Sequence, residues 1–141
     1  MNISEELTEA YIKTHYIVLH EKQFTLRIGK RSNNLLEIFK EQGVNCGAFV
    51  TACNPYSRIV SPEINTKLLS ELYSILSNDY MVISGIAKDP ESKWPLEKSF
   101  MVLGISMEDA MNIGRSFNQN ALVWCGMNTI PKLLILTEQN F

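Results

Sequence analysis

The spacing of apolar residues along the chain predicts a series of short strands. Residues 24–28 alternate apolar and polar positions, which is typical of a half-buried strand. Residues 46–52 form a nearly continuous apolar run without charge, as expected for a central strand buried on both faces. By the same criteria, further strands are expected at residues 16–20, 80–87, 99–105, 121–125 and 132–136.

Between these strands, three segments carry apolar residues at helical spacing. The first follows Ser32 or Asn33, either of which can cap a helix, and ends at Gly43. The second opens with Ser61 as N-cap and a proline at the first helical position, where its missing N–H costs nothing. The third follows Ser106 and extends to about residue 117. About three helices are therefore predicted.

The resulting element order is β-β-α-β-α-β-β-α-β-β. Paired strands separated by helices indicate an α+β fold, with helices covering the faces of a mixed, mostly antiparallel sheet. We expect one domain over residues 1–141, with residues 1–10 as a loose N-terminal segment and 88–96 as the longest loop. The order of the strands in the sheet cannot be derived from one sequence.

Composition narrows the class of protein. The chain has 141 residues, of which 45% are hydrophobic and 20% charged, with a net charge of −2, so it is globular rather than disordered. The main group of basic residues consists of Lys22, Arg27, Lys30 and Arg31. Four such charges are typical of an ordinary solvated surface, which argues against nucleic-acid binding. No apolar run reaches the roughly 20 residues that span a bilayer. The polar, acidic start is unlike a signal peptide, so a cytoplasmic location is expected.

Motifs for common catalytic chemistry are absent. The sequence contains no phosphate-binding glycine loop, no HExxH and no spacing of His and Cys residues that indicates a metal site, so no metal is predicted. Cys53 lies at a strand end and could act as a nucleophile with His15 or His20 as its base. The alternative is that Cys53 fills space at the rim of the sheet. Catalytic residues and cofactors therefore remain unassigned.

Polar residues follow the most buried predicted strand. Thr51, Asn54 and Ser57 lie at or just past its end, where ligands gather in sheets with helical crossovers. Asn65 lies near the start of the next helix, whose free N–H groups favour an anion. Ordinary turn and capping chemistry explains the same residues without a ligand.

Two further segments carry residues suited to recognition. Trp94 lies in a charged loop, where an indole can stack on a planar ligand or plug the core. Glu97 directly precedes a strand and could act as a base or as a solvated charge. Gln119 lies in a helix-to-strand turn rich in amides, which can read a ligand or simply cap the helix.

Three blocks together resemble a known family. Residues 48–55 (AFVTACNP), 94–100 (WPLEKSF) and 117–121 (FNQNA) are similar, in order and spacing, to the domain-of-unknown-function family DUF3293 of uncharacterised bacterial proteins. The resemblance covers residues 11–136. It departs from the family at Cys53, where a tryptophan is usual, and at Glu97, which stands one position later than the family's W-x-E pattern places its carboxylate. The family implies no activity.

The leading hypothesis is a pocket at strand ends that binds a small polar or nucleotide-like ligand. Its expected residues are Thr51, Asn54, Ser57, Asn65, Trp94, Glu97 and Gln119. The rival hypothesis is a protein–protein interaction or regulatory module without catalytic activity, which would use an exposed sheet edge at 24–28 or 132–136, also for assembly into a homodimer.

Overall fold

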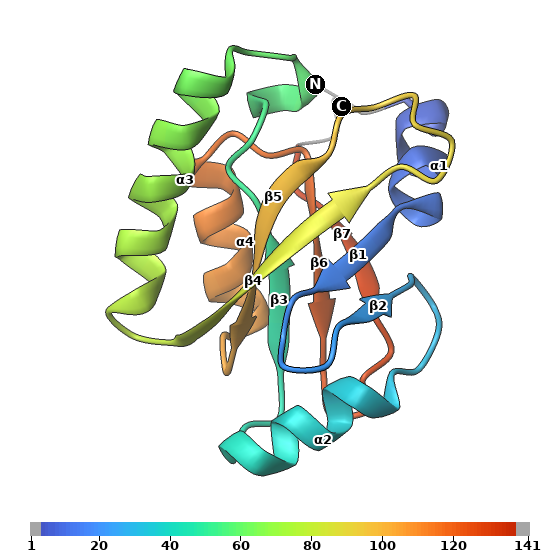
Figure 1. The fold of residues 1–141 in the computed structure, drawn as a ribbon, viewed down its shortest axis with the longest axis vertical. Helices are drawn as coiled ribbons and strands as arrows, with labels where there is room; N and C mark the ends of the chain where they lie inside the picture. The colour runs from blue at the N-terminus through green and yellow to red at the C-terminus, as the bar shows by residue number, and fades with distance from the viewer. Residues whose placement is uncertain (1–3, 138–141) are drawn as a thin grey trace.

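A computed structural model describes residues 4–137, and their strands form one seven-stranded sheet (Figure 1). The sheet order is β2-β1-β4-β5-β3-β6-β7, and every neighbouring pair is antiparallel. This confirms the α+β class, although the sheet contains no parallel pair among the described strands. The strands are β1 His15–Val18, β2 Phe24–Leu26, β3 Gly47–Val50, β4 Met81–Lys88, β5 Glu97–Leu103, β6 Ala121–Cys125 and β7 Lys132–Ile135.

Four helices accompany the sheet, each beginning after a serine whose hydroxyl accepts a hydrogen bond from the N–H three residues later. They are α1 Glu5–Lys13, α2 Asn33–Gln42, α3 Pro62–Ser77 and α4 Met107–Ser116, and a short 3₁₀ turn, η1 Pro55–Ser57, follows β3. The last three helices match the predicted segments.

The N-terminal segment differs from the expectation. Residues 5–10, expected to be loose, belong to α1. Ser4 caps this helix, two glutamates lie in its first turn and Lys13 in its last, so the charges oppose the helix dipole favourably. These local signals outweigh the lack of a long apolar stripe.

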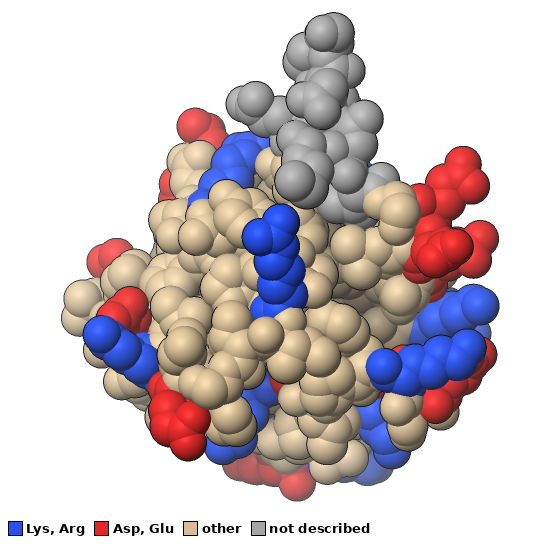
Figure 2. Space-filling model, turned by 90° about the horizontal axis from the view of Figure 1, so that it is seen from above, with Lys and Arg blue, Asp and Glu red and all other residues tan. Residues whose placement is uncertain are grey.

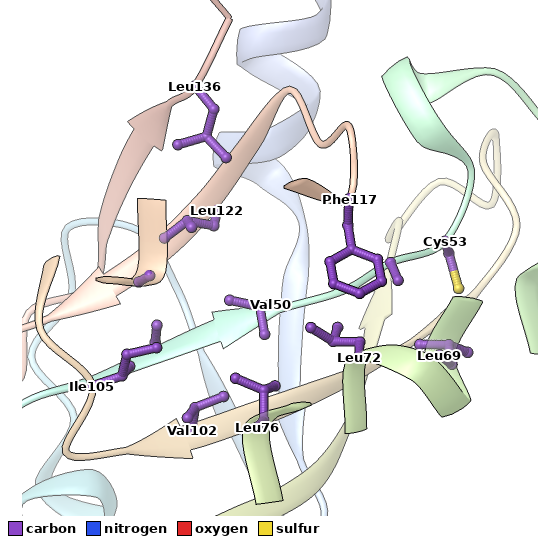
Figure 3. Close-up of a cluster of buried hydrophobic side chains, with 13 residues drawn as sticks. Val50, Cys53, Leu69, Leu72, Leu76, Val102, Ile105, Phe117, Leu122 and Leu136 are labelled. Carbon is purple, nitrogen blue, oxygen red and sulfur yellow. The ribbon is translucent and has the colours of Figure 1, made fainter. Parts of the chain in front are cut away.

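The two faces of the sheet carry separate apolar cores. On one face, α3 and α4 pack against the even-numbered residues of β3 and β5, and Figure 3 shows Leu72 and Leu76 of α3 beside Val50 and Val102. On the other face, α2 packs against the alternate residues of the same strands, including Phe49. Alternation of side chains along each strand produces this division.

The strands at the two edges of the sheet are β2 and β7, which contain most of the segments named in the interaction hypothesis. Within residues 4–137, no helix is both long and apolar enough to cross a membrane.

Candidate functional site

A cavity of about 470 Å³ opens on the sheet face that α2 covers, but away from α2 itself. Its floor consists of small side chains that face this side of the sheet: Thr51 beyond β3, Ala87 of β4, Ser99 of β5 and Ala121 of β6. Helix α1 lies over the same region, opposite α2 along the sheet (Figure 1). Small residues on the strands and a helix above them thus create the space.

Aromatic side chains form much of the cavity wall. Tyr11, Tyr16, Phe49 and Trp94 all line it. Tyr16 and Phe49 meet edge to face, with ring centroids 5.4 Å apart and planes at 72°. Such a wall suits a flat, largely apolar ring with polar edges.

The carboxylate of Glu97 lies in this aromatic setting. Its Oε2 atom accepts hydrogen bonds from Asn54 Nδ2 at 2.8 Å and from Trp94 Nε1 at 3.1 Å. Burial raises the pKa of Glu97 above its usual value, and the two hydrogen bonds partly oppose that effect. No described residue hydrogen-bonds its other oxygen, Oε1.

Asn54 organises the loop behind Glu97. It is only 4% exposed, and its Oδ1 accepts hydrogen bonds from Val60 N at 3.1 Å and Asn65 Nδ2 at 3.0 Å. Its own N–H donates to Asn65 Oδ1 at 2.8 Å. Asn54 therefore couples the start of α3 to Glu97.

The turn that contains Asn54 holds several residues in left-handed conformations. Asn54, Tyr56 and Ser57 have φ values of 49°, 53° and 58°. Such conformations cost about 1–3 kcal/mol each for residues other than glycine and cluster at functional sites. The N–H of Tyr56 donates to the carbonyl of Asn118 at 2.7 Å, which fixes the turn against the loop before β6.

A second polar cluster joins α1 to this turn. The Tyr11 hydroxyl and Ser57 Oγ are 3.1 Å apart and share a hydrogen bond, and Asn120 Nδ2 donates to Ser57 Oγ at 2.9 Å. Burial raises the pKa of Tyr11, so its hydroxyl stays protonated. Ser57 thereby connects three elements at one side of the cavity.

Thr51 and Gln119 use their donors on backbone carbonyls. Thr51 donates to the carbonyl of Lys98 at 2.7 Å. Gln119 Nε2 donates to the carbonyls of Cys53 at 3.1 Å and Phe117 at 3.3 Å. Both side chains also line the cavity.

The structure brings six of the seven expected residues together around the cavity: Thr51, Asn54, Ser57, Trp94, Glu97 and Gln119. Asn65 does not line it, and its amide bonds Asn54 instead. The sheet is antiparallel, so these residues come from both ends of strands, and the rule for carboxyl ends of parallel strands does not account for their convergence. Their role in ligand binding stays a prediction.

Sequence reasoning missed Tyr11, Tyr16 and Asn120. The capping signal at Ser4 could have revealed α1 and with it Tyr11. Tyr16 was visible only as a strand residue, and Asn120 lay in the amide-rich turn, where nothing distinguished it from its neighbours.

Cys53 lines the cavity but is poorly suited to be a nucleophile. Its thiol lies 3.6 Å from the carbonyl of Lys98, and burial raises its pKa, which disfavours the reactive thiolate. Neither His15 nor His20 lines the cavity. Within the described part of the chain, no three His, Cys, Asp or Glu side chains are grouped as a metal site would need.

Comparison with known proteins gives one match. The family model described as "Protein of unknown function (DUF3293)" matches residues 50–122, which is more than half of the chain. The chain belongs to this family. No curated protein and no solved structure matches the chain.

The family segment carries all seven expected residues, from Thr51 to Gln119. Tyr11 and Tyr16, from α1 and β1, lie outside it. The DUF3293 segment thus supplies the carboxylate and the amides, and the N-terminal elements supply part of the aromatic wall.

Proposed function

We propose that this protein binds a small polar molecule with a flat ring, nucleotide-like in that respect, in the cavity between α1 and the sheet. The observation that carries the proposal is Glu97. Its carboxylate lies in an aromatic-lined cavity, Asn54 and Trp94 hold one oxygen, and no described residue bonds the other.

The free-energy cost of burying the Glu97 carboxylate supports a functional role for it. Burial of an ionised group without a cationic partner costs free energy, and an apolar side chain would fill the same place without that cost. Within residues 4–137, the ion pair found is Lys93–Glu91, at 2.8 Å, which leaves Glu97 without a cation. Buried, perturbed carboxylates in cavities are characteristic of binding and catalytic sites.

The dimensions agree with a small ligand. Small-molecule sites enclose about 300–1,000 Å³, are mostly apolar and contain few, well-placed polar groups. The cavity, at about 470 Å³, falls in that range. It has room for one or two fused rings.

The test is a ligand-observed NMR screen of small heterocycles, followed by calorimetry of each binder with three proteins. The isosteric Glu97→Gln variant keeps an oxygen for Asn54 and Trp94 but removes the charge. For ligands that donate a hydrogen bond to Glu97, we expect the variant to lose about tenfold or more in affinity, as for loss of a charge-assisted hydrogen bond. Glu71→Gln, at an exposed position of α3, is the matched control and should bind as the wild type does.

Two results would overturn the proposal: a screen without binders, or a set of binders none of which changes its affinity between wild type and Glu97→Gln. Asn54→Ala is a poorer test because Asn54 also holds Val60 and Asn65, so its loss would disturb the loop itself.

The edge strands favour a second candidate, an interaction module. β7 ends the sheet on one side, and Met127 and Ile130 in the loop before it are 73% and 38% exposed. Edge strands with apolar neighbours can pair with another chain. Sedimentation velocity over a range of concentrations tests self-association, and a monomer at every concentration would count against a homodimer.

A further inference from the structure

Three hydroxyl groups that line the cavity are already used as donors. Thr51 donates to the carbonyl of Lys98, Ser99 Oγ to the carbonyl of Glu97 at 3.1 Å, and Tyr16 to the carbonyl of Tyr11. Each of these hydroxyls has a single hydrogen. They can therefore accept from a ligand but cannot donate to it.

Most side-chain N–H groups are used in the same way, although only one of the two hydrogens on Asn54 Nδ2 has an acceptor among the described residues. Asn54 and Trp94 donate to Glu97 Oε2, and Gln119 Nε2 donates to two backbone carbonyls. Two acceptors remain without a hydrogen bond from any described residue: Oε1 of Glu97 and Oε1 of Gln119. The interior of the cavity is therefore rich in acceptors.

One hydroxyl hydrogen remains available. Ser57 Oγ accepts from Asn120, and the pair Ser57–Tyr11 shares one hydrogen bond between two hydroxyl groups. Whichever of the two donates to its neighbour, the hydrogen of the other stays free. Since both residues line the cavity, the site offers a single hydroxyl donor beside its acceptors.

The charged side chains at the rim of the cavity also disfavour an anionic ligand. Glu6 and Glu9 of α1 and Asp89 and Glu91 of the β4–β5 loop line the cavity, against two cations from the same segments. One of those cations, Lys93, is paired with Glu91. Figure 2 looks onto this end of the molecule, where blue Lys and Arg side chains lie dispersed among red Asp and Glu side chains without a broad basic patch. A phosphate would meet net repulsion here.

From this inventory we infer that the ligand is a planar nitrogen heterocycle that carries an exocyclic amino group and no phosphate. The amino group supplies N–H donors to Glu97 and Gln119. A ring nitrogen or carbonyl accepts from the Ser57–Tyr11 pair, and the aromatic wall receives the flat ring. The inference rests on the proposed binding function and names its ligand class.

Matched pairs of probes test the inference by calorimetry. Adenine and cytosine carry the exocyclic amino group, and hypoxanthine and uracil carry an oxo group in its place. AMP adds a phosphate to the adenine ring. We expect each amino compound to bind wild type at least about tenfold more tightly than its oxo partner, and adenine at least about tenfold more tightly than AMP.

The Glu97→Gln variant should change this preference. Its side-chain oxygen is expected to remain on Asn54 and Trp94, so its NH₂ group faces the cavity where Glu97 Oε1 was. Affinity for adenine and cytosine should then fall by about tenfold or more, while that for hypoxanthine and uracil stays equal or rises. Glu71→Gln should keep the wild-type order.

The outcomes separate the two proposals. Oxo compounds or AMP that bind wild type as well as their amino partners would overturn the inference and leave the binding function standing. So would cavity binders from the NMR screen that lack an amino group, if none of the five probes binds. A screen without any binder would overturn both.

Discussion

At Glu97, the two carboxylate oxygens have different roles: Oε2 is held by the protein, and Oε1 is the acceptor proposed to meet the ligand. Oε2 is fixed by Asn54 and Trp94, so the carboxylate cannot turn away from the cavity without breaking two hydrogen bonds. Burial penalises its ionised form. The free protein is thus less stable with a charged Glu97 than with a neutral one.

The first prediction is a pH-dependent stability difference between Glu97→Gln and wild type. The pKa of Glu97 is raised in the folded state, so its favourable contribution is complete below the unfolded pKa of about 4.3 and is lost as pH rises through the folded pKa. The Tm of the variant relative to wild type should therefore increase from about pH 4 to about pH 7. Parallel thermal unfolding curves at all pH values would contradict this, and Glu71→Gln serves as the control.

The three cysteines should differ in reactivity. Burial raises the pKa of all three thiols, to about 12 for Cys125, and Cys46 is the most exposed. Alkylation of the folded protein near neutral pH, followed by peptide mass spectrometry, should label Cys46 first and Cys125 last. If Cys53 reacted fastest, the cysteine-nucleophile hypothesis would regain support.

At the scale of the elements, the small residues of the strands determine where side chains pack closely over the sheet and where a cavity remains. Gly85 of β4 lies against Phe49, and Ala87, two residues on, lines the cavity. The pattern of apolar residues at 80–87 predicted the strand β4. Nothing in the sequence showed which face of the sheet would carry a cavity. That depends on α1 and α2, which cover different parts of one face.

Gly85→Ala tests this close packing. An added Cβ would lie 2.7 Å from the Phe49 ring and 2.9 Å from the carbonyl oxygen of Ile17, so backbone or ring must shift. We expect a loss of about 1–3 kcal/mol in the free energy of unfolding, measured by urea denaturation. Ser84→Ala, at the exposed neighbouring position, should change it by less than about 0.5 kcal/mol. An unchanged midpoint for Gly85→Ala would show that the contact is absent.

In the whole molecule, two cores lie back to back across one sheet. The cavity opens on the face whose core contains Tyr16, Phe49 and Val123, although three residues of the other core, Val50, Cys53 and Leu122, also line it. Periodicity predicted ten elements in their order along the chain because helix and strand patterns are local. Sheet order was beyond prediction, since β3 lies between β5 and β6 through contacts distant in sequence. Six of the seven residues named for the site line one cavity, but the rule for carboxyl ends of parallel strands does not explain this in an antiparallel sheet, and their role in binding stays a prediction.

Because the two cores lie on opposite faces of the sheet, we predict that a substitution in the core of one face leaves the ligand affinity of the cavity on the other face unchanged. Leu72 of α3 is 1% exposed and belongs to the core on the face opposite the cavity. Leu72→Ala should cost about 2–5 kcal/mol in the free energy of unfolding. At a temperature where the variant remains folded, its affinity for a cavity ligand should equal that of wild type in calorimetry. A large change in affinity would show that the two faces are coupled.

The most direct test of ligand binding uses the two tryptophans as internal reporters. Trp94 Nε1 donates to Glu97 at the cavity, and Trp124 Nε1 donates to the carbonyl of Ile105, away from it. In a ¹H–¹⁵N correlation spectrum, the two indole N–H signals can be followed while pools of small heterocycles are added. We expect a pool that contains a binder to shift the Trp94 signal and leave the Trp124 signal in place. If no pool shifts Trp94, or if both signals move together, the cavity is not a ligand site.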